Sequence, residues 1–583
     1  MKYLLSRLRP RLSSGSPTPP QDLIRSELFS IERLEQHAES LAAAQGVTRR
    51  PGAGRELVSR LGDNGRVLLA VYRDIGKAIR EERAITPAAE WLVDNFHIVE
   101  EQIREIRDDL PRGYYRQLPK LETGPLEGYP RVFGLAWAYV AHTDSHFEPE
   151  TLVRFVRAYQ RIQPLTIGEL WAVAITLRIV LVENLRRASD LIESSRAERQ
   201  QADALADRLL GTHGEEAESL DLVLRSLEPA PLPRAMAVQL VQRLRDQDPA
   251  VTPALHWLDE RLAAQATTAE EVVGEEHQRQ GAMNVTVRNV ITSMRLMSAV
   301  DWAEFFESVS LVDAVLRTDA HFGAMDFATR DRYRHAIEEL ARGSGRNEGE
   351  VAAKALHAAR QAKPRTPPGG QGPSDGREQD PGYYLISKGR PALESEIGFR
   401  ISPKIRLGRV RPDTKVVAYI AAISVVTALV LAWALLLLAR AGIPAPNLAV
   451  LAVLALAVAS DAAVALVNHM VTHRLGAKIL PGLELRDGVP KELRTIVVVP
   501  TLLTSAAEIE EQVERLEVRH LANAEGDIRF ALLSDWTDAA TETTARDEEL
   551  LATAVAAIDR LNRRHEPAPD GERFLLLHRR RVW

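Results

Sequence analysis

The segment Val416–Ala439 reads "VVAYIAAISVVTALVLAWALLLLA", and the interpretation of the whole chain starts from it. It carries no charge and, as a helix, is long enough to cross the hydrocarbon core of a bilayer. Arg440 and the turn "AGIPAPN" follow, and a second apolar run, Leu448–Val467, contains a single acid, Asp461. The pattern predicts a hairpin of two transmembrane helices, residues 416–439 and 448–467. A buried helical hairpin in a soluble protein is the alternative, but uncharged runs this long are rare outside membranes.

Basic residues around the two spans predict their orientation. They lie before the first span and after the second, with only Arg440 between the spans; those before it are Lys404, Arg406, Arg409, Arg411 and Lys415, and those after it are Arg474 and Lys478. By the positive-inside rule both flanks are cytoplasmic and the short loop is outside. The apolar run in the N-terminal segment "MKYLLSRLRPRL" is too short for the core of a signal peptide.

Asp461 is the one acid within the predicted spans. With both flanks cytoplasmic, it lies in the half of its span nearer the cytoplasm. An intramembrane acid is a candidate for a substrate or ion contact. The alternatives are that it packs against another helix or reaches the membrane interface.

The chain before the spans is predicted to divide into three parts. Residues 1–361 form a cytoplasmic all-α domain, for example at 88–106, "AAEWLVDNFHIVEEQIREI", whose apolar residues recur at helical spacing after a Thr86-Pro87 start. Residues 362–382 are rich in Pro and Gly and form a flexible linker. Residues 383–415 form a basic juxtamembrane segment.

The chain after the spans, residues 490–583, alternates strands and helices. A strand over Thr495–Val499 is closed by Pro500, a helix capped by Ser505 follows, and two more strands are predicted at 527–535 and 573–579 with a helix between them. Apolar strands in this order indicate a parallel sheet of the kind covered on both faces. A half-sheet of three strands nevertheless leaves one face unfilled and an edge unpaired.

Ligands of such sheets bind at the carboxyl ends of the strands, where Pro500, Thr501 and Asp535 are placed. Neither a GxGxxG nor a GxxxxGK[ST] motif follows the first strand, so dinucleotide and P-loop chemistry are not indicated. Asp535 could accept hydrogen bonds from the base or ribose of a nucleotide. Equally, Ser534 or Asp535 could cap the following turn. The arginines at 579–581 are expected to be solvated.

Composition excludes several classes of function. The 583 residues carry a net charge of −6, which argues against a nucleic-acid partner. Cysteine is absent, which excludes disulfides, thiolate metal sites and cysteine nucleophiles.

Several long segments resemble the N-terminal region of bacterial cyclic β-1,2-glucan synthases. Before the spans these are "EWLVDNFHIVEEQIREIRDDLPRGYYRQLPKL", "EEHQRQGAMNVTVRNVITSMRLMSAVDWAEFFESVSLVDAVLR", "RYRHAIEELARGSGRNEGEVAAKAL" and "YYLISKGR"; after them come "VVVPTLL" and "FALLSDWTDA". They occur in order over nearly the whole chain.

The resemblance implies a multi-pass enzyme of the bacterial inner membrane that polymerises glucose from UDP-glucose into β-1,2-glucan. It implies a nucleotide-sugar transferase (GT-A-like) fold for residues 490–583, with Asp535 at the position whose acid contacts the uridine. It also implies a divalent cation, Mg²⁺ or Mn²⁺, and partners in the rest of the synthase: further membrane spans and glucoamylase-like and phosphorylase-like domains.

The chain stops just after the third strand, so the transferase domain is expected to be incomplete. No catalytic residue and no metal ligand is assigned within it, and Asp535 and Asp538 are not taken as the family's metal-binding pair. By this expectation the chain alone transfers no glucose. The alternative function is a non-catalytic, membrane-anchored helical scaffold that binds a partner.

Overall fold

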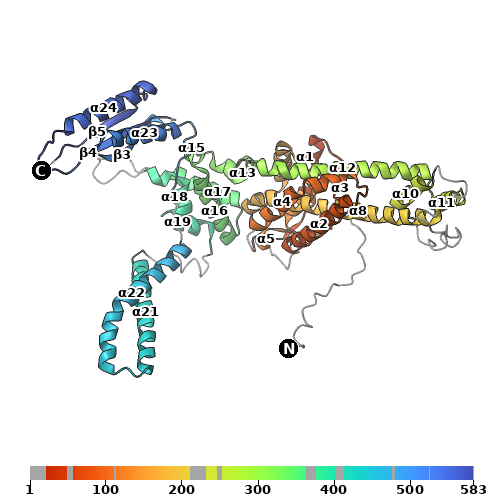
Figure 1. The fold of residues 1–583 in the computed structure, drawn as a ribbon, viewed down its shortest axis with the longest axis horizontal. Coiled ribbons are helices and arrows are strands. Elements are labelled where there is room, and N and C mark those ends of the chain that lie inside the picture. Colours follow the sequence, from red (N-terminus) through yellow and green to blue (C-terminus); the bar gives the residue numbers. More distant parts are fainter. Residues whose placement is uncertain are drawn as a thin grey trace. The chain divides into compact units, whose positions relative to one another are not determined.

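The computed structural model describes residues 22–48, 57–109, 113–210, 232–245, 252–362, 376–400, 412–475, 480–523 and 526–581. It divides into two compact units. The first consists of Met1–Val315 and Arg346–Ala352, and the second of Leu316–Gly345 and Ala353–Trp583. Figure 1 shows the helices and strands of both.

The first unit is helical apart from a two-stranded antiparallel ladder. Its elements are α1 (Ile31–Ala44), β1 (Val47–Thr48), α2 (Leu57–Arg80), α3 (Pro87–Asp94), α4 (Phe96–Asp109), α5 (Tyr114–Gln117), β2 (Lys120–Leu121), α6 (Arg131–His142), α7 (Pro149–Ile162), α8 (Ile167–Leu210), α10 (Arg234–Leu244), α11 (Thr252–Ala264), α12 (Ala269–Ala299), α13 (Trp302–Val309) and α14 (Leu311–Leu316). The start of α3 is as predicted, because the Thr86 side chain accepts a hydrogen bond from the Ala89 N–H and Pro87 opens the helix.

The single helix expected over residues 88–106 is in fact two. The break falls at Asn95, which separates α3 from α4. The Asn95 side chain donates to the carbonyl of Trp91 at 2.9 Å. Asparagine side chains compete in this way for backbone groups, which makes Asn a poor residue for a helix interior. The apolar periodicity continues through the break and therefore conceals it.

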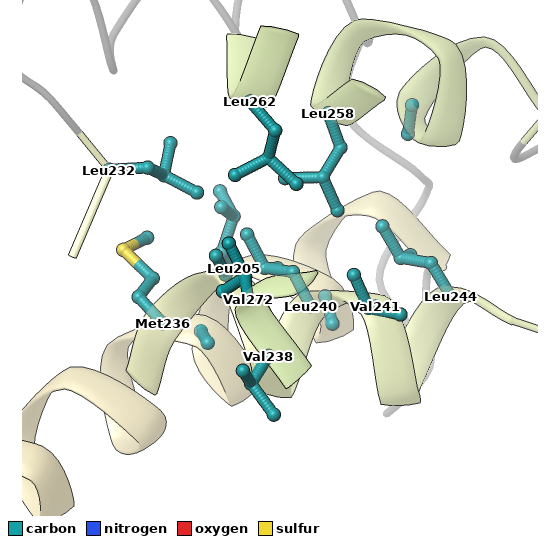
Figure 2. Packing of buried hydrophobic residues seen from close by; sticks show 14 of the residues in the cluster. Leu205, Leu232, Met236, Val238, Leu240, Val241, Leu244, Leu258, Leu262 and Val272 are labelled. Carbon is teal, nitrogen blue, oxygen red and sulfur yellow. The ribbon is translucent and has the colours of Figure 1, made fainter. Parts of the chain in front are cut away.

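A small helical bundle lies at one end of the long helices α8 and α12 (Figure 1), where α10 and α11 join them. Its core is a cluster of aliphatic side chains that includes Leu205, Met236, Leu240, Leu258 and Val272 (Figure 2). All five are at least 94% buried. Full burial of one such side chain is worth about 1.5–3 kcal/mol, so this cluster holds the ends of α8 and α12 at a defined separation.

The second unit contains helices, an apolar hairpin and a small sheet. Its elements are α15 (Ala320–Ala324), α16 (Phe327–Ser344), most of α17 (Glu348–Gln361), the 3₁₀ helix η2 (Gly376–Gln379), α18 (Pro381–Ile386), α19 (Arg390–Ile397), α21 (Pro412–Arg440), α22 (Ala445–Leu475), the 3₁₀ helix η3 (Lys491–Leu493), β3 (Thr495–Leu503), α23 (Ala506–Ala522), β4 (Ile528–Trp536), α24 (Asp547–Arg564) and β5 (Phe574–His578).

The boundaries before the hairpin differ from those expected at residues 361, 382 and 415. The helices α18 and α19 fall in the segment predicted to be linker and juxtamembrane chain, and they pack on α16. Tyr333 of α16 donates to Asp380 at 2.8 Å, and Glu339 of α16 pairs with Arg390 at 2.7 Å. Residues on both sides of the linker thus share one unit, which spacing along the chain could not indicate. Residues 363–375 and 401–411, including most of the basic flank, lie outside the described residues.

The predicted hairpin is present as α21 and α22, which lie side by side (Figure 1). Val416–Arg440 and Ala445–His473 are long and apolar enough to cross a membrane, with mean hydropathy of 2.6 and 2.5. Only 6% and 17% of their most apolar windows are buried. The core helices of a soluble protein would be mostly buried, so the soluble alternative is disfavoured.

The strands form a parallel sheet in the order β3-β4-β5. Pro500 does not close the first strand, as had been expected, because β3 continues to Leu503 and Pro500 pairs with Leu533. Proline is tolerated here because β3 is the outer strand among the described residues, so its missing N–H need not break the ladder with β4. Ser505 caps α23 as predicted, with its hydroxyl accepting from the Glu508 N–H.

Among the described residues, helices cover only one face of this sheet. Side chains such as Val499, Phe530 and Phe574 are buried against α23 and α24. Alternate residues on the other face, such as Leu502 and Leu533, are 51% and 41% exposed. Both crossovers run in the same direction, and right-handed crossovers then place both helices on one face. The sequence predicted a sheet with helices on both faces, but within residues 490–581 helices cover only one of them.

Candidate functional site

The carboxyl-terminal edge of the sheet brings together residues from three separate segments. Thr501 of β3 lies opposite Ser534 of β4, and the next pair is Leu502 and Asp535. Ser534 in turn lies opposite His578 of β5. Thr501 and Asp535 are thus neighbours at one edge, whereas Pro500 is one residue further inside the strand.

Asp535 is held by two hydrogen bonds. Its Oδ1 accepts from the Trp536 N–H at 2.9 Å, and its Oδ2 accepts from the Arg579 guanidinium. Desolvation raises the pKa of Asp535, but these two donors and the charge of Arg579 outweigh it, so the pKa is lowered. The carboxylate is therefore ionised at neutral pH and available as an acceptor, since its side chain is 28% exposed.

The alternative role for Ser534 or Asp535 is to cap the following turn, and among the described residues their side chains accept one backbone N–H, that of Trp536. The Ser534 hydroxyl is 2.9 Å from His578 Nδ1. The helix α24 instead begins at Asp547, whose carboxylate accepts from the N–H and hydroxyl of Thr544. Asp535 and Ser534 are thus engaged across the sheet edge, toward β5 and the residues after it.

Of the arginines expected to be solvated, Arg579 is exposed as expected, whereas the Arg581 side chain is largely buried. Arg579 pairs with Asp535, as described, while its own side chain is 75% exposed. The Arg581 side chain is only 10% exposed and lies 3.0 Å from the Asp547 carboxylate. Arg581 also donates to the carbonyl of Glu542 at 2.8 Å and lies over the Trp536 ring. The only signal in the sequence was their place directly after an apolar strand.

His578 was not singled out from the sequence, and it lies at this edge on β5, opposite Ser534. Its ring meets that of Trp536 edge-on, with centroids 4.4 Å apart. Burial lowers its pKa, and the nearby Asp535 and Asp547 carboxylates offset part of that effect. Its Nε2 is buried and has no hydrogen-bond partner among the described residues. A neutral histidine at this position can donate or accept one further hydrogen bond.

This edge therefore presents an ionised carboxylate, the exposed Arg579 guanidinium, a histidine and the Thr501 hydroxyl. Such a set suits a ligand that offers hydrogen-bond donors to Asp535 and negative charge to Arg579. Within the described parts of the chain, no group of three or more His, Asp or Glu side chains is arranged to hold a metal ion.

Asp461, the intramembrane candidate, lies on the exposed surface of α22. The contact with α21 is made by residues such as Ala459 and Ala463, which are 5% and 0% exposed. Residues two positions away from these point to the opposite side of a helix. Asp461 therefore faces away from α21, and it is not brought to the sheet-edge residues by any described contact.

These features define a class of protein: a helical protein with a hairpin of two membrane-length apolar helices and a small parallel α/β sheet. No protein-family profile matches the chain. The chain is, however, 38% identical over 580 residues to the cyclic beta-(1,2)-glucan synthase NdvB of Rhizobium meliloti (strain 1021). That similarity confirms the resemblance to cyclic β-1,2-glucan synthases. It covers 98% of this chain and 20% of the synthase, so the chain spans about a fifth of the length of this relative.

Proposed function

We propose that the chain is the N-terminal part of a membrane-bound cyclic β-1,2-glucan synthase that polymerises glucose from UDP-glucose. The observation that carries the proposal is the 38% identity over 98% of the chain, which includes the helical region, the apolar hairpin and the sheet alike. The parallel sheet with a polar carboxyl-terminal edge supports it, because that is where such sheets bind nucleotides.

In this proposal the sheet is the first part of a GT-A-like nucleotide-sugar domain, and Asp535 accepts hydrogen bonds from the uridine. Thr501 and Pro500 lie beside it on the neighbouring strand. Arg579, whose side chain is 75% exposed, offers positive charge at the same edge, which suits a diphosphate. The Asp535–Arg579 ion pair must then loosen or rearrange when the nucleotide binds.

The chemistry we infer is an inverting displacement at the glucose anomeric carbon. A base removes the proton of the acceptor hydroxyl, and a divalent cation, Mg²⁺ or Mn²⁺, would stabilise the departing diphosphate. We assign neither a base nor a metal ligand to this chain, because the family pattern places both after the third strand. In this proposal both belong to the remainder of the synthase.

The proposed setting is the bacterial inner membrane, with the helical and transferase parts in the cytoplasm. Membrane lipid around the hairpin and the other regions of the synthase are the proposed partners. These regions are the further spans and the glucoamylase-like and phosphorylase-like domains.

The test is the affinity for UDP-glucose of a synthase that carries Asp535→Asn. The amide keeps the size of the carboxylate but loses its charge and part of its capacity to accept hydrogen bonds. Hydrogen bonds to charged groups are strong enough that we expect the affinity to fall by about 10- to 100-fold. Asp538→Asn, an exposed neighbour, is the matched control and should leave the affinity unchanged. Unchanged affinity in both variants would remove Asp535 from the nucleotide site.

A further inference from the structure

The chain that leaves the apolar hairpin pairs with the chain just before α16, far earlier in the sequence. Met325 lies opposite Leu483 in an antiparallel bridge. Backbone hydrogen bonds, both 3.0 Å long, join the residues on either side of this pair: Asp326 N–H to Gly482 O, and Glu484 N–H to Ala324 O. Two reciprocal hydrogen bonds define a register between the segments, as in a short antiparallel ladder.

Side chains at the start of α16 reinforce this pairing. Arg330 is only 2% exposed; its Nη1 donates to Glu484 Oε2 at 3.0 Å and also to the Met325 carbonyl. The buried Thr329 hydroxyl accepts from the Gly482 N–H at 2.9 Å. Burying a guanidinium is costly unless acceptors meet it. The segment after the hairpin supplies the carboxylate among these acceptors, so the pairing is part of how this region is built.

Gly482 is needed because the two segments approach closely. A Cβ at this position would lie 2.8 Å from Asp326 Oδ2, closer than van der Waals contact allows. The Asp326 side chain is not free to move away, since its Oδ1 caps α16 by accepting from the Thr329 N–H at 2.8 Å. Any side chain at residue 482 would therefore push the two segments apart.

The chain that enters the hairpin is fixed to the other end of α16. The Arg400 N–H donates to the Gly343 carbonyl at 3.1 Å. The Phe399 ring covers Gly343, where a Cβ would lie 2.1 Å from a ring carbon. The helix α16 has 18 residues and is about 27 Å long. The two flanks of the hairpin are thus held near opposite ends of one helix.

The helix α16 cannot enter the hydrocarbon core of a membrane. It carries charged side chains on successive turns: Arg330, Asp331, Arg334, Glu338 and Arg342. Such residues are expelled from the interior of a bilayer. Both flanks of the hairpin must then lie on the side of the membrane where α16 lies. This argument rests on contacts and is independent of the distribution of basic residues around the spans.

The sheet is tied to the same helix by a short link. Val489 forms a bridge with Gly526, and its carbonyl accepts from the Asp527 N–H at 2.7 Å, so the chain has already joined the sheet region there. Residues 485–488 alone separate Val489 from Glu484. A fully extended link of this length spans at most about 18 Å.

We propose that α16 closes the base of the apolar hairpin: it holds the entering chain at Gly343 and the leaving chain at Asp326–Arg330. The helices before the hairpin thereby anchor the sheet, and both remain on one side of the membrane. The proposal does not depend on which ligand binds at the sheet edge.

The first test is a disulfide across the Met325–Leu483 pair, which the cysteine-free sequence makes unambiguous. Paired residues whose neighbours form the hydrogen bonds have Cα atoms about 4.5 Å apart, within the range of a disulfide. The full chain, with Met325→Cys and Leu483→Cys and a protease site inserted in residues 363–375, is oxidised in membrane vesicles and then cleaved. The two fragments should stay joined on a non-reducing gel and separate on reduction.

The matched control combines Met325→Cys with Leu480→Cys, which shifts the second cysteine by about 10 Å along the strand. Its fragments should separate, as should those of each single-cysteine variant. Equal joining in the two double variants, or no joining in the Met325/Leu483 variant, would overturn the proposal.

The second test needs no cysteine and measures hydrogen exchange of the Glu484 amide in the full chain. Arg330→Met should speed exchange by about 10- to 100-fold, because hydrogen bonds to a charged group are lost. Gly482→Ala should also speed it, by the clash with Asp326. Two controls should leave it unchanged: Gly323→Ala, where a Cβ meets nothing within 4 Å, and Arg342→Met, which removes an exposed ion pair. An unprotected Glu484 amide in the unaltered chain would refute the pairing itself.

Discussion

At the residue scale, Glu183 is a buried charge that is held by several donors in the helical unit. It is 1% exposed and accepts hydrogen bonds from Arg60 Nε at 2.9 Å, Asn64 at 2.8 Å and Arg187 at 3.1 Å. Burial raises its pKa, but these donors outweigh burial and lower the pKa to about 2. A buried charge with this many partners ties α2 to α8 and is costly to disturb.

The pH dependence of stability follows from that pKa. Since the folded pKa lies below the unfolded value of 4.5, the contribution of Glu183 is complete above pH 4.5 and is lost as pH falls toward 2. The difference corresponds to about 3 kcal/mol. Unfolding of α8 between pH 7 and pH 3, measured by hydrogen exchange in the full chain, should show more than half of this loss, because pH 3 is still one unit above the folded pKa.

Glu183→Gln should remove that dependence and lower the stability of the helical unit at pH 7 by about 3 kcal/mol, because Arg60 and Arg187 lose their shared counter-charge. The control is Glu193→Gln on the same helix, whose ion pair with Arg196 is much more exposed. It should change stability by about 0.5 kcal/mol or less. Similar losses in the two variants would show that Glu183 is not the anchor described.

At the scale of the element, β4 has two faces of different character. Leu532 is 0% exposed and packs in the core under α23 and α24, while its neighbour Leu533 is 41% exposed on the other face. The residues of β3 alternate in the same way, with Val499 buried and Leu502 exposed. Alternation of this kind is typical of a sheet with one covered face.

A matched pair of substitutions tests this reading of the sheet. Leu532→Thr should destabilise the α/β segment of the full chain by about 2–4 kcal/mol, because it loses apolar burial and places a hydroxyl in the core. Leu533→Thr should cost about 0.5 kcal/mol or less, as is usual at exposed positions. Chemical denaturation monitored by hydrogen exchange of β4 would measure both. A large loss for Leu533→Thr would mean that its face is covered as well.

At the scale of the whole molecule, the orientation of the apolar hairpin in the membrane can be tested directly. The basic residues around the apolar hairpin predict that the flanks are cytoplasmic and the α21–α22 turn is external. A reporter fused at Pro446 should therefore give a periplasmic signal, and one fused at Gly482 a cytoplasmic signal. Gly482 follows the second apolar helix, so the two fusions differ by one crossing. The reversed pair of signals would refute the predicted orientation.

The sequence by itself was sufficient for features that depend on local pattern. The long uncharged run at Val416–Ala439 predicted the apolar hairpin, because loops and strands are not apolar over such a length. The order of apolar strands and amphipathic helices predicted a parallel sheet, and Thr86 and Ser505 were read correctly as helix caps because capping needs only neighbouring residues. The family resemblance rests on long segments that occur in the same order, and it is confirmed by the 38% sequence identity to NdvB.

Tertiary structure decided what depends on residues distant in the chain. Spacing alone left a nucleotide contact and a turn cap equally open for Asp535, and its ion pair with Arg579, 44 residues away, arises only in the folded chain. Arg581 was expected to be solvated, but it pairs with Asp547, which lies 34 residues away in the sequence. Pro500 lies inside β3, which is the outer strand among the described residues. Arg199 and Glu276 lie 77 residues apart in the sequence, and the local pattern around each does not indicate that they are neighbours. Local propensity depends on consecutive residues, whereas ion pairs, strand pairing and burial depend on contacts between segments that are distant in the sequence.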